Sequence, residues 1–227
     1  MRLLLKLSTL VRLLIAMVLT IACPSVYAQE RDTTFDNLVR VEDAKVAGVF
    51  IDPDADFSIY KRVDILEPYV AFRANWQRDQ VRSNPANRVS SSDMDRIRTA
   101  AGELLMDVFI EALEANQGYT VVDHPGDDVL VLRPAIIDLD ISAPDNRGAG
   151  RSNSFSTTAG AATLYIELFD GASGKIIGRA IDRRVASRPG GQMQWSNSVT
   201  NTSDARRMFR VWADRLREFL DSHYSGN

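Results

Sequence analysis

Two stretches of the chain place apolar residues three or four positions apart, which is the spacing of one helix face. The first runs from Ser90 to Gln117, with Ser91 or Ser92 as the expected N-cap and Gly118 as the expected stop. Its apolar positions are Met94, Ile97, Ala101, Leu104, Leu105, Val108 and Ala112. The second runs from about Ser203 to Ser222, with apolar positions Ala205, Met208, Trp212, Leu216 and Phe219. Both stretches predict amphipathic helices.

Five other stretches read as strands, because short apolar or alternating runs are bounded by Gly, Pro and Asp. They are residues 60–72, 119–122, 129–141, 164–168 and 175–186. Pro68 ends or bulges the first, and the turn 170–174 joins the last two as a hairpin. Ile137, Leu139 and Ile141 are expected on one face of their strand. The order of elements predicts an α+β fold: a mainly antiparallel or mixed sheet of about five strands, with two helices packed on one face.

The first 28 residues have the layout of a secretory signal peptide. Cations up to Arg12 precede an apolar run of about ten residues, and the small-x-small triplet ending at Ala28 follows. A bilayer-spanning helix needs about 20 apolar residues, so export and cleavage after Ala28 are favoured over a membrane anchor. We therefore divide the chain into a signal peptide (1–28), a tether and edge segment (29–55), one α+β domain (56–222) and a tail (223–227).

An alternative for the leader is lipidation at Cys23. Thr20-Ile21-Ala22-Cys23 is similar to the lipobox of bacterial lipoproteins, although Thr20 stands where Leu or Val is usual and Pro24 follows the Cys. The two alternatives predict a soluble periplasmic protein and an outer-membrane-anchored lipoprotein, respectively. A lipid on Cys23 is the one contact with a membrane that the sequence predicts.

Composition narrows the class of protein. The chain has 227 residues, 27 Lys and Arg against 30 Asp and Glu, one Cys and two His. Without residues 1–28 there remain 24 cations against 30 acids, and so acidic a body is a poor nucleic-acid binder. One Cys and two His exclude a disulfide scaffold and a Cys/His zinc cluster. We predict no cofactor and no metal. No pattern predicts an oligomeric state.

Acidic residues suggest two weaker possibilities. Asp52, Asp54 and Asp56 have the spacing that begins a calcium loop, but Phe57 and Val63 replace its Gly and Glu, so a turn is favoured. Asp138 and Asp140 share one face of a strand. With Glu167 or Asp182 on neighbouring strands they could form a carboxylate pair for acid/base chemistry, although a solvated sheet face is the more ordinary explanation.

The candidate binding residues are Trp and Arg side chains. Trp76 and Trp195 fall in predicted loops beside Arg and Asn, an arrangement typical of recognition surfaces, while Trp that folds back over a core is more common. Arg147 and Arg151 lie in a polar predicted loop, and Arg206 and Arg210 lie on the polar face of the last helix. The usual explanation for such arginines is a solvated face.

Several short motifs resemble a bacterial envelope family known as domain of unknown function 3313. They are Asp56-Phe57-Ser58-Ile59-Tyr60-Lys61-Arg62-Val63, the run from Val70 to Trp76, Leu130-x-Leu132-Arg133-x-Ala135-Ile136, Glu167-Leu168-x-Asp170, the hairpin Gly174, and Asp182-Arg183-Arg184. The resemblance covers about residues 45–222. It implies a secreted or lipid-anchored protein and supplies no catalytic residues.

Together these features favour a non-enzymatic envelope module that binds a protein or cell-wall (peptidoglycan) partner in the periplasm. An envelope glycan hydrolase that uses paired carboxylates, and a purely structural envelope protein, are the alternatives. Neither His124 nor His223 lies beside a nucleophile motif, so an enzyme is the less favoured class.

Overall fold

The computed structural model describes residues 34, 36–83, 89–141, 155–156, 158–187, 194–195 and 198–223. Its main sheet has eight strands, in the order β1-β2-β9-β8-β6-β3-β5, with β4 paired to β6 beside β3. A separate pair joins β7 to β10. The strands are β1 Val39–Arg40, β2 Gly48–Ile51, β3 Arg62–Ile65, β4 Tyr69–Phe72, β5 Thr120–Val122, β6 Val129–Ile141, β7 Phe155–Ser156, β8 Thr158–Asp170, β9 Ile176–Ser187 and β10 Gln194–Trp195.

The sheet is mixed. Strands β6, β8 and β9 are long and antiparallel, whereas β3 and β4 run parallel to β6. Pro68 lies between β3 and β4, so the predicted strand 60–72 becomes two short strands that pair with successive parts of β6. The prediction of about five strands was therefore too low. Strands β1, β2 and β4 have only two to four residues, which is too short for an alternation of apolar and polar residues to be recognised.

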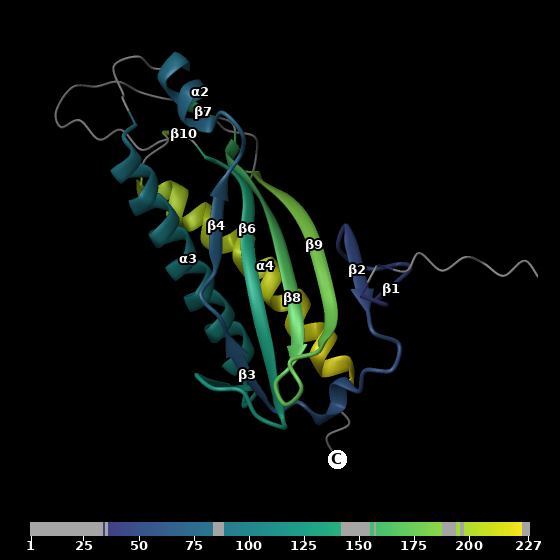
Figure 1. Cartoon of the computed structure of the whole chain (residues 1–227). Helices are drawn as coiled ribbons and strands as arrows, with labels where there is room; N and C mark the ends of the chain where they lie inside the picture. The colour runs from purple at the N-terminus through teal and green to yellow at the C-terminus, as the bar shows by residue number, and fades with distance from the viewer. Residues whose placement is uncertain are drawn as a thin grey trace, which may run out of the picture. The chain divides into compact units, whose positions relative to one another are not determined.

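Three helices accompany the sheet in the described residues: α2 Trp76–Ser83, α3 Ser91–Glu114 and α4 Ser198–His223. Figure 1 shows α3 and α4 crossing the same face of the sheet, as the sequence predicts for its two helices. Helix α3 packs against β4 and β5, while α4 packs against β8 and β9. Helix α2 is the exception, since the sequence predicts a loop around Trp76. None of the described helices combines the length and apolarity that a membrane span requires.

Local interactions fix both ends of α3. The N-cap is Ser90 rather than Ser91 or Ser92, and its side chain and that of Asp93 form a capping box. At the other end, the Arg217 guanidinium of α4 donates hydrogen bonds to the carbonyls of Leu113 (2.7 Å) and Ala115 (3.1 Å). Carbonyls at the end of a helix have no partner in the next turn, so α4 completes the end of α3.

A bulge changes which side chains of β6 face the helices. In its first half the buried residues include the even-numbered Leu130, Leu132 and Ile136. The register with β8 then shifts between Ile137 and Asp140, where Asp138 has a φ of 51°, and Leu139 is buried instead. The prediction that Ile137, Leu139 and Ile141 share one face of the strand was therefore wrong for Ile137, which precedes the shift.

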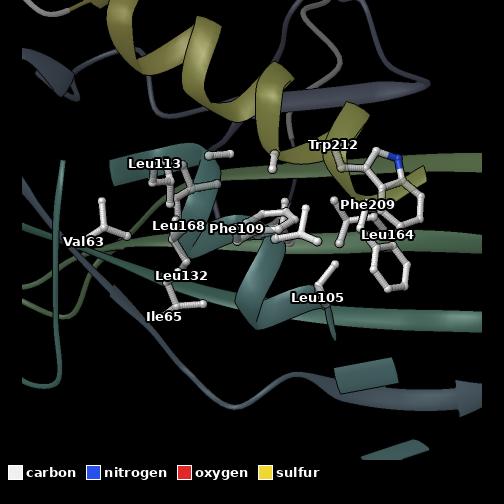
Figure 2. Close-up of a cluster of buried hydrophobic side chains, with 14 of the residues drawn as sticks. Val63, Ile65, Leu105, Phe109, Leu113, Leu132, Leu164, Leu168, Phe209 and Trp212 are labelled. Atoms are coloured by element: carbon white, nitrogen blue, oxygen red, sulfur yellow. The ribbon is translucent and has the colours of Figure 1, made fainter. Parts of the chain in front are cut away.

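The hydrophobic core lies between the sheet and the two long helices. Figure 2 shows Leu105, Phe109 and Leu113 of α3 among Val63 and Ile65 of β3, Leu132 of β6 and Leu164 and Leu168 of β8, with Phe209 and Trp212 of α4 above β8. The core positions α4 over β8 and β9, where the candidate site lies.

Candidate ligand-binding cavity

A cavity of about 430 Å³ lies between α4, β8, β9 and the N-terminal strand β2. Its volume falls within the range of about 300–1,000 Å³ that ligand sites occupy. Apolar side chains dominate its lining: Val41, Ala44, Val46, Val49, Ile51, Phe57, Phe109, Leu164, Ile166, Leu168, Ala180, Trp212, Leu216 and Phe219. A largely apolar lining of this kind favours apolar ligands or apolar parts of ligands.

The small residues of β9 explain why the space is unfilled. The residues of β9 that face α4 are Gly178, Ala180 and Asp182, which pair with Leu168, Ile166 and Leu164 of β8, respectively. A Cβ atom at Gly178 would meet the nearest atoms, those of Leu168, only at 3.6 Å. Neither Gly178 nor Ala180 has the side-chain volume to fill the gap below α4.

The cavity extends along α4. Its α4 lining residues Trp212, Leu216, Phe219 and Ser222 follow one stripe over about ten residues, or about 15 Å of helix. On β8 the lining runs from Leu164 to Leu168, about 13 Å of strand. The Trp212 indole binds Asp182, whereas Phe219 packs against Phe57, so the two ends of the cavity have different side chains.

Residues 41–51 cover the cavity from the side of β2. Val49 and Ile51 pair with Ala180 and Gly178 and line the cavity, as do three residues of the preceding loop: Val41, Ala44 and Val46. Beyond β2, the Asp52 carboxylate forms an ion pair with Lys175, whose cation lowers the pKa of that carboxyl. This ion pair attaches the end of the cover to the β8–β9 hairpin.

Charged side chains form an exposed rim where the cover meets α4. The Glu218 carboxylate accepts from Lys45 at 3.1 Å and from Arg215 at 2.8 Å. Lys45 is 68% exposed and Glu218 54%, so this rim meets water. The two cations lower the pKa of the Glu218 carboxyl, Lys45 being the larger cause. Polar groups at the exposed rim and apolar groups inside suit an amphiphilic ligand.

A buried hydrogen-bond network closes the Trp212 end. The Asp182 carboxylate accepts from Trp212 Nε1 at 2.9 Å and from the Ala47 N–H at 3.2 Å, and it pairs with Arg184 Nε at 2.8 Å. Asp182 is 8% exposed. One carboxylate therefore connects α4, β9 and the cover.

The predicted acid/base carboxylates are held separately by arginine. Glu167 lies on the other face of the sheet, where Arg133 Nε donates to it at 2.8 Å and Arg179 Nη2 at 3.2 Å. Although burial alone would raise it, the pKa of Glu167 is lowered by the hydrogen bonds from Arg133 and Tyr165. Asp140 pairs with Arg73 at 2.8 Å, and Asp138 is exposed at the bulge. Glu167 and Asp140 thus have separate cations and form no carboxylate pair.

Asp64 is a buried carboxyl that the sequence did not single out. It is 8% exposed, and burial raises its pKa, as does the nearby charge of Asp123. Its neighbour His124 acts in the opposite direction. Among the described residues, no three His, Cys, Asp or Glu side chains are placed to hold a metal ion.

Trp76 begins α2 rather than lying in the predicted loop, and it is only 1% exposed. Of the two roles that the sequence leaves open for it, recognition or covering the core, its burial fits the second. Its ring stacks on Phe72 at 4.2 Å between centroids, and its Nε1–H donates to the Ile141 carbonyl at 2.8 Å. The side chain is therefore part of the interior, where it closes the end of β6.

Arg206 and Arg210 are on the surface of α4, as predicted, but they are not unpaired. Both donate to Glu111 of α3, at 3.4 Å and 2.7 Å, and Arg210 also pairs with Asp214 at 3.0 Å. They connect the two helices and do not line the cavity.

Four further residues were predicted from the sequence as binding or lipidation sites. The side chains of Arg147, Arg151, Trp195 and Cys23 lie outside the described residues. The backbone of Trp195 belongs to β10, rather than to the loop that the sequence predicts, and pairs with Phe155 of β7.

The cavity itself was missed by sequence reasoning. Its rim joins Lys45 to Glu218, 173 residues apart in sequence, and no local pattern connects them. A weak signal existed in β9, where glycine and alanine occupy alternate positions of an otherwise ordinary strand.

Comparisons with known proteins identify relatives without assigning an activity. A family model described as "Protein of unknown function (DUF3313)" matches residues 29–216. A search of curated proteins found no match.

Solved structures to which this chain is similar include three from bacteria. A PelC dodecamer from Paraburkholderia phytofirmans shares 12% identity at a TM-score of 0.36, covering 70% of this chain and 90% of that one. The hypothetical protein CT253 from Chlamydia trachomatis shares 11% at 0.40, covering 72% and 99%. Protein XCC0632 from Xanthomonas campestris shares 14% at 0.39, covering 73% and 86%. Likenesses this low carry no functional inference.

Proposed function

We propose that this chain, which belongs to the DUF3313 family of proteins of unknown function, is an exported, non-enzymatic binding module of the bacterial envelope. The observation that carries the proposal is the apolar cavity below α4, with a charged rim open to water. Such a site, largely apolar with a few convergent polar groups, is the usual architecture of a ligand-binding pocket.

The electrostatics of the carboxylates favour binding over glycan hydrolysis. A glycosidase needs one carboxylic acid with a raised pKa beside a second carboxylate. Glu167 instead has a lowered pKa among arginines, and Asp140 is paired with Arg73. Asp182 accepts hydrogen bonds from Trp212 and Ala47. Each of these three carboxylates is thus engaged by donors that connect parts of the fold, and Glu167 lacks the raised pKa that a general acid needs.

The proposal that the protein is exported depends on the sequence of its first 28 residues. The apolar run and the small residues that end at Ala28 support a signal peptide, and the weaker lipobox at Cys23 supports a lipid anchor as the alternative. The intact mass of the protein isolated from its host decides between them. A start at Gln29 supports the periplasmic form, a lipidated Cys23 supports the anchored form, and an unprocessed chain in the cytosol contradicts export.

The binding proposal is tested with an apolar fluorescent probe, N-phenyl-1-naphthylamine, added to the processed protein. We expect saturable binding of one probe per chain. Ala180→Phe places a ring in the cavity and should weaken probe binding about tenfold or more, the equivalent of about 1.4 kcal/mol. Val185→Phe is the matched control, because Val185 lies on the same strand, is 53% exposed and does not line the cavity.

Comparison of Ala180→Phe with the Val185→Phe control shows whether the probe binds in the cavity. Equal loss of probe binding in both β9 variants, with both folded, would place the probe elsewhere on the protein. Absence of saturable binding to the wild type would remove the binding function altogether.

A further inference from the structure

We propose that the cavity binds a single, unbranched hydrocarbon chain of an amphiphile, which lies along α4 with its polar head at the rim formed by Lys45, Arg215 and Glu218. This inference rests on the proposed binding function and names the class of ligand. It follows from the shape of the cavity, from the placement of its polar groups and from the way it is covered.

The shape argues for a chain rather than a compact ring system. The lining follows α4 from Trp212 to Ser222, or about 15 Å. On β8 the lining runs from Leu164 to Leu168, or about 13 Å of strand. An extended chain can contact both α4 and β8 over most of this length.

The placement of polar groups orients that chain. The inward surface at the middle of β8 and β9 is apolar, since Ile166 and Ala180 are paired neighbours there and both line the cavity. Arg179, the adjacent charged residue of β9, directs its guanidinium to Asp36 and Glu167 on the other face of the sheet. The charged side chains of the rim, by contrast, are exposed. An amphiphile therefore gains most by burying its chain and leaving its head in water beside the rim.

The rim can accommodate a polar head without leaving a buried charge unpaired. Glu218 holds both Lys45 and Arg215, and all three side chains are at least 36% exposed. A head group that takes over one of these contacts leaves the remaining charges in water, where an unpaired ion costs little. The rim therefore gives no selectivity between the head groups of a fatty acid and a lysophospholipid. The cavity recognises the hydrocarbon chain instead.

The cover offers a route by which the chain enters. Val41, Ala44 and Val46 line the cavity, and their loop meets α4 through the exposed Lys45–Glu218 pair. A surface pair of this kind contributes little to stability, so this edge of the cover can separate from α4 at low cost. The other end of the cover is held more firmly, by Asp52 with Lys175 and by the pairing of β2 with β9.

The test is a chain-length series measured by calorimetry on the processed protein, isolated without detergent. Saturated fatty acids are compared at increasing length, with lysophosphatidylcholines of matched chains as the second arm. Burial of each added methylene contributes about 0.8 kcal/mol, so we expect affinity to rise about fourfold per methylene. The rise should stop once the chain outgrows the length of the cavity.

Variants on β9 connect the length dependence to this cavity. Ala180→Phe should shorten the chain length at which affinity stops rising and weaken the longest chains about tenfold or more. Gly178→Val is a second, smaller blocking variant in case Ala180→Phe does not fold. Val185→Phe, on the opposite face of β9, should leave the whole series unchanged.

The outcomes separate the ligand class from the proposed function. Length-dependent binding in either arm supports the inference, and the arm that binds more tightly identifies the source of the chain. If the naphthylamine probe binds and is lost in Ala180→Phe, but affinity does not depend on chain length, the cavity is a binding site for a different class of ligand and the inference is overturned. If neither probe nor chains bind, the proposed function fails with it.

Discussion

The two long helices cover the same face of one sheet with different results. Under α3 the space is filled, since Leu105 and Leu113 are at most 1% exposed and belong to the core that also holds buried residues of β3 and β6. Under α4, toward β9, a cavity of about 430 Å³ remains. The difference arises in the strands, because β9 presents Gly178 and Ala180 to its helix, whereas β6 presents leucines at positions 130 and 132.

This contrast indicates that stability and binding are divided between the halves of the layer. Close packing makes the α3 half intolerant of lost volume. The α4 half has already given up some packing, which costs stability unless something occupies the space. A protein gains from that arrangement only where the space is used.

The largest difference should appear between two leucine truncations. Leu113→Ala removes a fully buried side chain from the filled half and should lower the free energy of unfolding by about 2–5 kcal/mol. Leu216→Ala removes a half-buried wall of the existing cavity and should cost about 1–2 kcal/mol. Urea denaturation of both variants measures the difference. Equal losses would mean that the α4 half is as tightly packed as the α3 half.

A second effect concerns the closed end of the cavity. Trp212→Phe removes the N–H that donates to the buried Asp182 carboxylate, and should cost about 2–3 kcal/mol because the acceptor is charged. Trp76→Phe is the matched control, since its lost partner is the neutral Ile141 carbonyl and the expected cost is about 1 kcal/mol. Thermal and urea unfolding should rank the two variants in this order. The reverse order would show that Asp182 does not depend on Trp212.

Two glycines allow the effect of one added methyl group to be compared at the end of α3 and on β9 below α4. At Gly118 a Cβ atom would clash with the Arg217 guanidinium and the Leu113 carbonyl, so Gly118→Ala should disturb the end of α3 and cost about 1–3 kcal/mol. At Gly178 a Cβ atom has only ordinary contacts, and Gly178→Ala should be neutral or slightly stabilising, as expected for alanine in a strand. The free energies of unfolding of the two variants give the result. A destabilising Gly178→Ala would contradict the open space below α4.

Sequence reasoning succeeded where a pattern was long enough to have a period. The stripe from Met94 to Ala112 predicts α3 within a turn, and the turn at 170–174 predicts the β8–β9 hairpin. Helix α4 starts at Ser198, before the predicted Ser203, and the short α2 was missed. The short elements were missed because an eight-residue helix and strands of two to four residues contain too few turns or alternations to show a period.

The remaining features depend on tertiary structure. The bulge at Asp138 shifts the inward face of β6, but nothing local distinguishes that Asp from its neighbours in the alternation. The cavity is formed by β2, β8, β9 and α4, which are distant in sequence, and its existence depends on volumes that do not match across the layers. A hydrophobic pattern records which side chains are buried and does not record whether they fill the space between them.

The smallest expected effect concerns the attachment of the cover. Asp52→Asn removes the carboxylate that pairs with Lys175 and should lower the free energy of unfolding by about 1 kcal/mol at neutral pH. Because Lys175 holds the folded-state pKa of Asp52 below its unfolded value of about 3.9, this stability is complete above that pH and is lost as the pH falls through the folded-state pKa. The gap between wild type and variant should therefore narrow in acid.

Asp54→Asn is the matched control for this ion pair, because Asp54 lies in the same turn but is exposed, and it should not show the loss of stability at neutral pH. Urea denaturation of both variants and the wild type across the acid range gives the comparison. A gap that persists unchanged well below the unfolded-state pKa of about 3.9 would show that the cover is not attached through Asp52 and Lys175. The pairing of β2 with β9 would then be its remaining hold on the sheet, and the cover would be expected to open from both ends.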